Sequence, residues 1–294
     1  MFILTTDRLR VEVEEPSELI DKTTRFDHTA FIRQVILDGE MRFCAEEPFG
    51  PGGINSGGQG LCSEFQPVVS EISGDAYMLK MGVGLLKKLK GEPYNPFQRY
   101  VCIPSDISVE KGSNFLRFTS VLKMTPDYAL TICRTILVEE NRLMLKTEVE
   151  NSGSEELEFR EYCHNFLSMD GRSLGPAYCL ELPCVKKLQS YAQQNERANQ
   201  LFRCEEQRLY VDACITKPVR FSVDDAGIAD CDAFSWKLSH AETGGWVTGT
   251  AHFRPSEVTV WAKDNVFCPE VFFQNRILPG APCIWKRTWT FGSS

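Results

Sequence analysis

One stretch decides the fold: Arg142-Leu143-Met144-Leu145-Lys146-Thr147-Glu148-Val149-Glu150. Its side chains alternate, so every second residue from Leu143 to Val149 shares one face of an extended strand. Turn-forming residues follow at Asn151-Ser152-Gly153-Ser154, and another strand signal begins at Leu157. The stretch therefore predicts antiparallel strands joined by a short turn.

The same pattern recurs along the chain, at Val258–Ala262 and Ile284–Phe291 for example. Many short strands separated by turns predict an all-β fold, a large antiparallel β-sandwich, rather than alternating βαβ units. One polar, helix-permissive segment, residues 186–208, predicts a short helix or a long surface loop. No linker composition interrupts the chain, so we expect a single domain over residues 1–294.

Composition sets broad limits on function. The chain has 294 residues, a net charge of −8 and 43% hydrophobic residues, which is typical of a soluble globular protein. The acidic balance argues against nucleic-acid and anionic-membrane partners. No apolar run approaches the roughly 20 residues of a membrane span, and the first residues carry no signal-peptide pattern. We expect a cytoplasmic protein, a monomer or a homodimer.

The cysteines and histidines do not form metal motifs. None of the twelve cysteines stands in a C-x-x-C spacing, and the four histidines form no HxxEH or HxH pattern. Several cysteines, such as Cys102 and Cys133, lie inside apolar runs. Free, buried thiols in a reducing compartment are the expected state, with no metal and no cofactor.

Two segments carry candidate chemistry. Around His164, alternation places a polar-aromatic set on one strand face, namely Glu158, Arg160, Tyr162, His164 and Phe166. Such a face suits a polar ligand, although a solvated edge with an incidental histidine has the same pattern. Glu270 follows Pro269 among apolar residues, where desolvation raises a carboxyl pKa toward the range of a general base. A loop glutamate at the start of a strand is the simpler alternative. The two residues lie 106 positions apart (270 − 164), so only tertiary structure can unite them.

The order of short motifs along the whole chain resembles the aldose 1-epimerase, or galactose mutarotase-like, superfamily. The motifs that carry the resemblance are Arg25–Val35, Gly60–Phe65, Gly82–Leu86, His164–Leu167, Cys268–Glu270, Leu278–Gly280 and Trp285–Phe291. The resemblance implies a β-sandwich with a sugar in a cleft over one sheet. It also implies that Glu270 is the general base for the anomeric hydroxyl and His164 the general acid for the ring oxygen. Acid–base work on a bound ring predicts a gap of several ångströms between the two groups, without a direct salt bridge.

This sequence departs from the family pattern at two positions. Gln59 stands where many members have an arginine, and Met81 stands where many have a second histidine. Other residues are therefore expected to contact the sugar, and the candidates are Gln59, Glu64, Lys80, Lys88 and Tyr162. A cluster of Lys87, Lys88 and Lys90 could receive a phosphate, or could be a solvated strand end.

Three functions remain open at this stage. They are a mutarotase acting on an aldose, a hexose-6-phosphate 1-epimerase, and a non-catalytic carbohydrate-binding protein of the same fold. A glycosidase is disfavoured, because it normally needs two carboxyl groups about 5–9 Å apart and Glu270 has no evident acidic partner.

Overall fold

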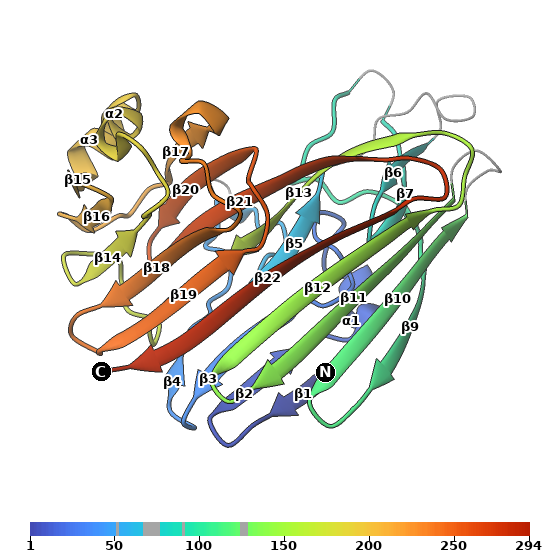
Figure 1. The fold of residues 1–294 in the computed structure, drawn as a ribbon, viewed down its shortest axis with the longest axis horizontal. Helices are drawn as coiled ribbons and strands as arrows, with labels where there is room; N and C mark the ends of the chain where they lie inside the picture. The colour runs from blue at the N-terminus through green and yellow to red at the C-terminus, as the bar shows by residue number, and fades with distance from the viewer. Residues whose placement is uncertain (51–52, 67–76, 90–91, 124–128) are drawn as a thin grey trace.

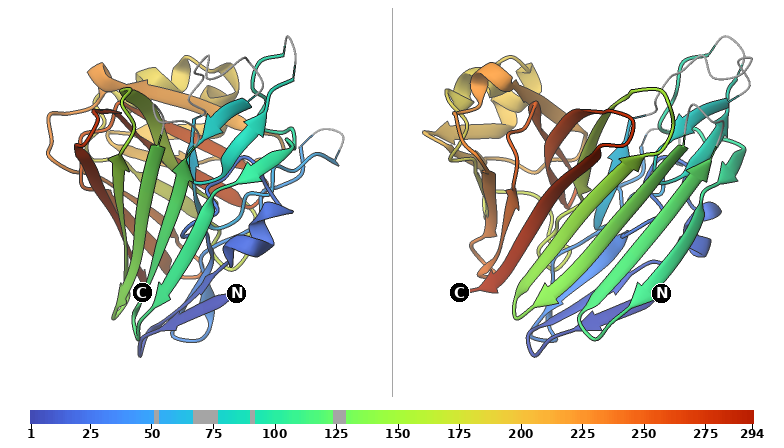
Figure 2. Two further views of the ribbon diagram at one scale, coloured as in Figure 1. Left: turned by 90° about the vertical axis from the view of Figure 1, so that its right-hand side faces the viewer. Right: turned by 45° about the vertical axis from the view of Figure 1, so that its right-hand side comes forward.

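The computed structural model describes residues 1–50, 53–66, 77–89, 92–123 and 129–294. Two large antiparallel sheets pack against each other as layers (Figures 1 and 2). Both chain termini lie at one end of the molecule, and the smaller strands β6 and β7 lie at the other (Figure 1). The all-β sandwich predicted from the alternating segments is confirmed.

The first sheet has nine strands and carries the candidate site. Their order in space is β1 (Phe2–Thr5), β2 (Leu9–Val13), β3 (Ile32–Leu37), β5 (Leu61–Phe65), β13 (Leu157–Asn165), β21 (Val266–Ile277), β20 (Glu257–Lys263) and β17 (Val219–Asp224), with β4 (Met41–Arg42) paired to β3. Strands distant in sequence are neighbours here: β13 lies between β5 and β21. This arrangement brings the segments of His164 and Glu270 side by side.

The second sheet has ten strands and forms the other layer. Their order is β15 (Phe202–Glu205), β16 (Arg208–Val211), β14 (Tyr178–Glu181), β18 (Phe234–His240), β19 (Gly245–Ala251), β22 (Pro282–Ser293), β12 (Arg142–Asn151), β11 (Ala129–Glu139), β10 (Phe115–Lys123) and β9 (Asp106–Lys111). In β12 the alternation holds as predicted, because Leu143, Leu145, Thr147 and Val149 are all buried.

The remaining elements are small. A three-stranded sheet contains β6 (Tyr77–Lys80), β7 (Gly84–Lys87) and β8 (Cys102–Pro104). The helical pieces are α1 (Pro16–Ile20), α2 (Leu188–Gln193), α3 (Glu196–Leu201) and the 3₁₀ turn η2 (Asp225–Gly227). None of the helices in the described part of the chain has the length and apolar content of a membrane crossing.

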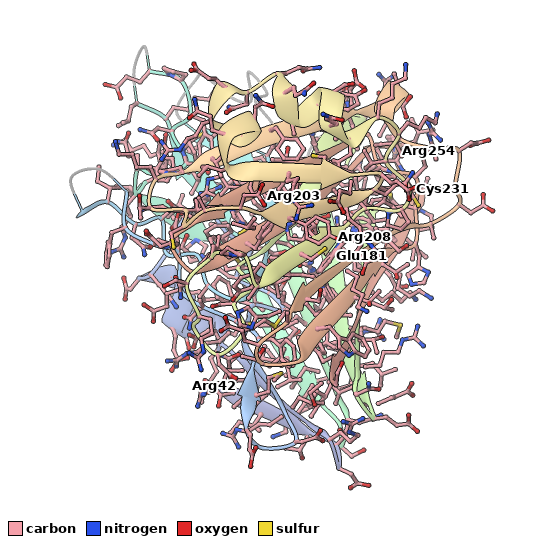
Figure 3. The ribbon with its side chains drawn as sticks, turned by 90° about the vertical axis from the view of Figure 1, so that its left-hand side faces the viewer. Arg42, Glu181, Arg203, Arg208, Cys231 and Arg254 are labelled. Atoms are coloured by element: carbon pink, nitrogen blue, oxygen red, sulfur yellow. The ribbon has the colours of Figure 1, made fainter. Side chains whose placement is uncertain are left out.

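The segment predicted as a helix or surface loop, residues 186–208, is only partly so. It forms α2 and α3, but its last part is strand β15, the edge of the ten-stranded sheet. Charged side chains cover this end of the molecule, including Arg203, Arg208 and Glu181 (Figure 3). Arg208 Nε lies 3.3 Å from Glu181 Oε2. Arg203 lies on the edge strand β15 itself, where exposed charge protects a sheet from pairing with another chain.

The core lies between the two sheets. Val11 and Phe65 of the first sheet and Leu145 and Trp289 of the second belong to one buried apolar cluster. Burying each large apolar side chain contributes about 1.5–3 kcal/mol, so this layer holds the sheets at a fixed spacing. All twelve cysteines are free, as predicted, although five are buried, six are half-buried and Cys214 is exposed.

Candidate active site

A cleft of about 930 Å³ opens on the outer face of the nine-stranded sheet. Its floor comes from the side chains of five neighbouring strands, and its rim includes loop residues such as Glu47 and Phe97. The volume lies near the upper end of the 300–1,000 Å³ range that is usual for small-molecule sites.

Strand register explains why these side chains share one face. In antiparallel strands, residues directly opposite each other point to the same side of the sheet. Tyr162 of β13 lies opposite both Glu64 of β5 and Phe272 of β21. On the other side of β21, Trp261 of β20 lies opposite Arg220 of β17. All five line the cleft.

His164 and Glu270 are in direct contact at the centre of this face. His164 Nε2 lies 3.1 Å from Glu270 Oε1, and both side chains are more than 90% buried. The prediction of an open gap between them, wide enough for a sugar ring, is therefore wrong. Its physical cause is the register: the pairing of Tyr162 with Phe272, continued along the strands, sets His164 directly across from Glu270. Side chains so placed start only about 4.5–5.5 Å apart at Cβ.

Aromatic rings hold the imidazole of His164 in place. The ring stacks flat on Phe166, with centroids 3.9 Å apart and planes 4° from parallel. Phe26 and Trp261 contact it edge-on, at 6.1 and 5.8 Å between centroids. Nδ1 is buried and has no hydrogen-bond partner among the described residues. Nε2 is therefore the ring nitrogen that can exchange a proton with Glu270.

Burial shifts the two pKa values in opposite directions. Desolvation lowers the pKa of His164 well below 6.5, and the charges of Arg25 and Arg220 lower it further. Desolvation raises the pKa of Glu270 to about 8, against the effect of the same two arginines. The predicted direction for the carboxyl is confirmed. At neutral pH the pair consequently holds one proton beyond the N–H of a neutral imidazole, and the 3.1 Å hydrogen bond shares this proton between the carboxyl of Glu270 and Nε2 of His164.

A charged network forms one wall of the cleft around Glu64. Arg25 Nε lies 2.6 Å from Glu64 Oε2, and the hydroxyl of Tyr162 donates to the same oxygen at 2.6 Å. Lys80 Nζ lies 3.3 Å from Glu64 Oε1. Burial opposes ionisation of Glu64, but Lys80, Arg25 and Tyr162 together outweigh it and lower the carboxyl pKa. Arg25 also donates to the Tyr162 oxygen at 2.9 Å, so the network fixes both side chains.

The residues predicted to bind sugar separate into two groups. Glu64 and Tyr162 line the cleft beside His164 and Glu270. Lys80 is fully buried behind Glu64, and burial lowers its pKa to about 8. Gln59, also buried, accepts a hydrogen bond from Lys22 Nζ at 3.1 Å. The described residues that line the cleft do not include Lys80, Gln59 or Lys88.

Two members of the predicted phosphate cluster, Lys87 and Lys88, are described by the structure. Lys87 is exposed and Lys88 half-buried at the end of β7, and neither is among the described lining residues. Lys90 lies outside the described residues.

Sequence reasoning missed several lining residues, notably Arg25, Arg220 and Trp261. Arg25 was predicted only as part of a strand motif, although its side chain lines the cleft. The sequence did contain a pattern that could have identified Trp261, since it shares a strand face with the polar Thr259 while Val258 and Val260 lie on the other face. Arg220 carried no signal, because only the pairing of β17 with β20 brings it to this face.

Among the residues that the structure describes, no group of three or more His, Cys, Asp or Glu side chains could hold a metal ion. The site as described offers titratable groups, aromatic rings and charged hydrogen-bonding side chains.

Solved structures share this fold at low sequence identity. No protein-family profile matches the chain, and no curated protein matches it. A galactose mutarotase related enzyme from Lactobacillus acidophilus is 14% identical over 99% of this chain and 97% of its own, with a TM-score of 0.59. A galactose mutarotase-like protein from Lactobacillus casei is 11% identical over 99% and 100%, with a TM-score of 0.61. An aldose epimerase homologue from C. elegans is 10% identical over 99% and 98%, with a TM-score of 0.55. The chain therefore has the galactose mutarotase-like fold.

Proposed function

We propose that this protein is an aldose 1-epimerase-like mutarotase, which interconverts the α and β anomers of a sugar by acid–base ring opening. The observation that carries the proposal is the buried contact of His164 with Glu270 in the cleft floor. Titratable groups with strongly shifted pKa values in a cleft are typical of catalytic sites. The fold shared with mutarotase-like structures supports a sugar as the ligand.

The proton balance of ring opening suits a pair that holds one proton. In the proposed reaction the proton shared by the pair starts on His164, so that Glu270 is a carboxylate. Glu270 then takes the proton of the anomeric hydroxyl while the C1–O5 bond breaks and His164 protonates O5. The product is an open-chain aldehyde, and the pair still holds one proton, now on Glu270. Rotation about C1–C2 and the reverse transfers close the ring on the other face of the aldehyde. Because the net charge of the pair never changes, no charge is left unpaired in the buried floor.

The neighbouring side chains provide the contacts that a sugar needs. Trp261 and Phe272 offer apolar ring surface to the C–H faces of a pyranose. Glu64 and Arg25 offer charged hydrogen-bonding groups to its hydroxyls, fixed in advance by their mutual ion pair. Entry of the sugar must loosen the direct contact between His164 and Glu270, so that both groups reach the substrate.

Anomer exchange measured by NMR tests the proposal. Purified protein is added to a panel of free aldoses, aldose phosphates and aldoses of larger size, with spontaneous mutarotation subtracted. The expected result is faster anomer exchange of at least one sugar, and competitive inhibition by its methyl glycoside. The ring of the glycoside cannot open, because its anomeric oxygen carries a methyl group. Binding of a sugar without acceleration of any panel member would contradict the proposal and favour a carbohydrate-binding protein.

A further inference from the structure

The hydrogen-bonded ladder between β13 and β21 is interrupted at the candidate pair. Regular pairing runs from Leu157–Ile277 to Tyr162–Phe272. The strands meet again at the isolated bridge Leu167–Phe267, with backbone bonds of 3.3 and 2.9 Å. The residue numbers of the partners add to 434 at both ends, so the register is unchanged across the interruption. His164 and Glu270 lie inside it.

One cause of the interruption is Pro269, which has no N–H to donate to β13. Its carbonyl accepts instead from the side chain of Asn165, whose Nδ2 also lies 3.2 Å from the carbonyl oxygen of Cys163. Asn165 directly follows His164, and Pro269 directly precedes Glu270. A single amide thus joins the backbones of the two strands at the catalytic candidates.

The Asn165 amide has a fixed orientation. Trp289 Nε1 donates to Asn165 Oδ1 at 3.0 Å, so the oxygen faces the ten-stranded sheet and the nitrogen faces Pro269. Asn165 and Trp289 are both buried, with 3% and 2% of their surfaces exposed. The opposite sheet therefore sets the direction of the amide.

A second buried side chain acts on the other side of Glu270. Arg287 Nη2 donates to the carbonyl of Val271 at 3.1 Å, and Arg287 Nη1 lies 2.7 Å from Glu161 Oε2. The carbonyls on both sides of Glu270 therefore accept hydrogen bonds from side chains that reach through from the interior of the sandwich. The outer face stays free for the cleft.

We propose that Asn165 is a positioning residue for the His164–Glu270 pair: its amide bridges the two strands where the ladder is interrupted and sets the separation of the two groups. The proposal rests on the proposed function for its effect on catalysis, but its effect on geometry is independent of any substrate. Asn165 itself points away from the cleft, since it lies on the strand face opposite His164.

The chain offers a matched control for this residue. Asn151 of β12 is also fully buried, and its Nδ2 also donates to a carbonyl of β21, that of Ile277 at 3.2 Å. That contact lies seven residues along β21 from Glu270, inside the regular ladder. Asn151→Ala therefore removes a buried amide that donates to the same strand, together with its contacts to Glu155 and Gly153, without touching the interruption.

The experiment compares the parent, Asn165→Ala, Trp289→Phe and Asn151→Ala by thermal unfolding and by the imidazole ¹⁵N signals of selectively labelled histidine. The chain has only four histidines, so a His164→Asn spectrum assigns the signal of His164. We expect Asn165→Ala to shift the His164 signals, Trp289→Phe to shift them less, and Asn151→Ala to leave them unchanged despite a comparable loss of stability. If the parent exchanges anomers, Asn165→Ala should lower kcat by roughly 10- to 100-fold with little change in KM.

The outcomes separate this inference from the proposed function. Unmoved His164 signals in both Asn165→Ala and Trp289→Phe, or equal shifts in the Asn151→Ala control, would overturn the positioning role. If Asn165→Ala does not fold, Trp289→Phe decides alone, because it keeps an aromatic ring at this position and removes the N–H that orients Asn165. A parent that exchanges no sugar would end the mutarotase proposal while leaving the ¹⁵N comparison intact.

Discussion

The stability of the protein should depend on pH through Glu270, and the substitution Glu270→Gln isolates this effect. In the folded protein, the pair holds one proton beyond the N–H of the neutral imidazole up to the raised carboxyl pKa of about 8. This is because the pKa of His164 is lowered and that of Glu270 is raised. In the unfolded chain, His164 and Glu270 have their ordinary pKa values of 6.5 and 4.5. By the same count, the two side chains then hold one proton between pH 4.5 and 6.5 and none above. From pH 6.5 to 8 the folded state therefore binds one more proton, and stability falls as pH rises.

The size of this fall follows from the same values. Each pH unit with a one-proton difference changes the free energy of unfolding by about 1.4 kcal/mol, so 1.5 units give about 2 kcal/mol. In Glu270→Gln, His164 is neutral above pH 6.5 in both states, and this contribution is absent. The parent should thus lose about 2 kcal/mol more than the variant between pH 6.5 and 8.

Urea denaturation at pH 6.5, 7.2 and 8.0 measures this difference directly. The contributions of other titrating groups to the free energy of unfolding cancel in this comparison, because parent and variant share these groups. Parallel pH profiles for the two proteins would refute the reasoning, since they would mean that Glu270 is ionised in the folded protein throughout this range.

Two further predictions concern the network around Glu64. Lys80→Met should lower the free energy of unfolding by about 3 kcal/mol, because a buried carboxylate loses one of its two cations; denaturation midpoints equal to those of the parent would contradict this. Arg25→Met should raise KM for the responsive sugar by about 10-fold or more while changing kcat less, because it removes a charged donor from the cleft wall. An unchanged KM would show that Arg25 does not contact the substrate.

The sequence predicted the sandwich well because alternation is a local property. The side chains of β12 obey it from Leu143 to Val149, and burial follows the same period in the structure. The same parity put Tyr162 and His164 on one face, where the structure places both in the cleft. Such inferences need only the geometry of a single strand.

Pairing between strands could not be predicted in this way. The distance between His164 and Glu270 depends on which strand lies beside β13 and in which register, and neither is encoded within a single segment. The prediction of sugar contacts at Gln59, Lys80 and Lys88 relied on residue type and position in the chain. The topology places these residues behind or beside the described cleft wall. Arg25 was missed for the converse reason, since its role depends on Glu64 and Tyr162 from two other strands.

The most direct test of the account is the anomer exchange rate of the parent, His164→Asn and Glu270→Gln on a sugar that the parent turns over. Both substitutions are nearly isosteric, so circular dichroism should show an unchanged fold. The account predicts that each variant exchanges anomers about 10²- to 10⁴-fold more slowly than the parent, the usual contribution of a positioned acid or base, while sugar binding weakens less. Variants that exchange anomers as fast as the parent would contradict the central claim that this buried pair moves the protons.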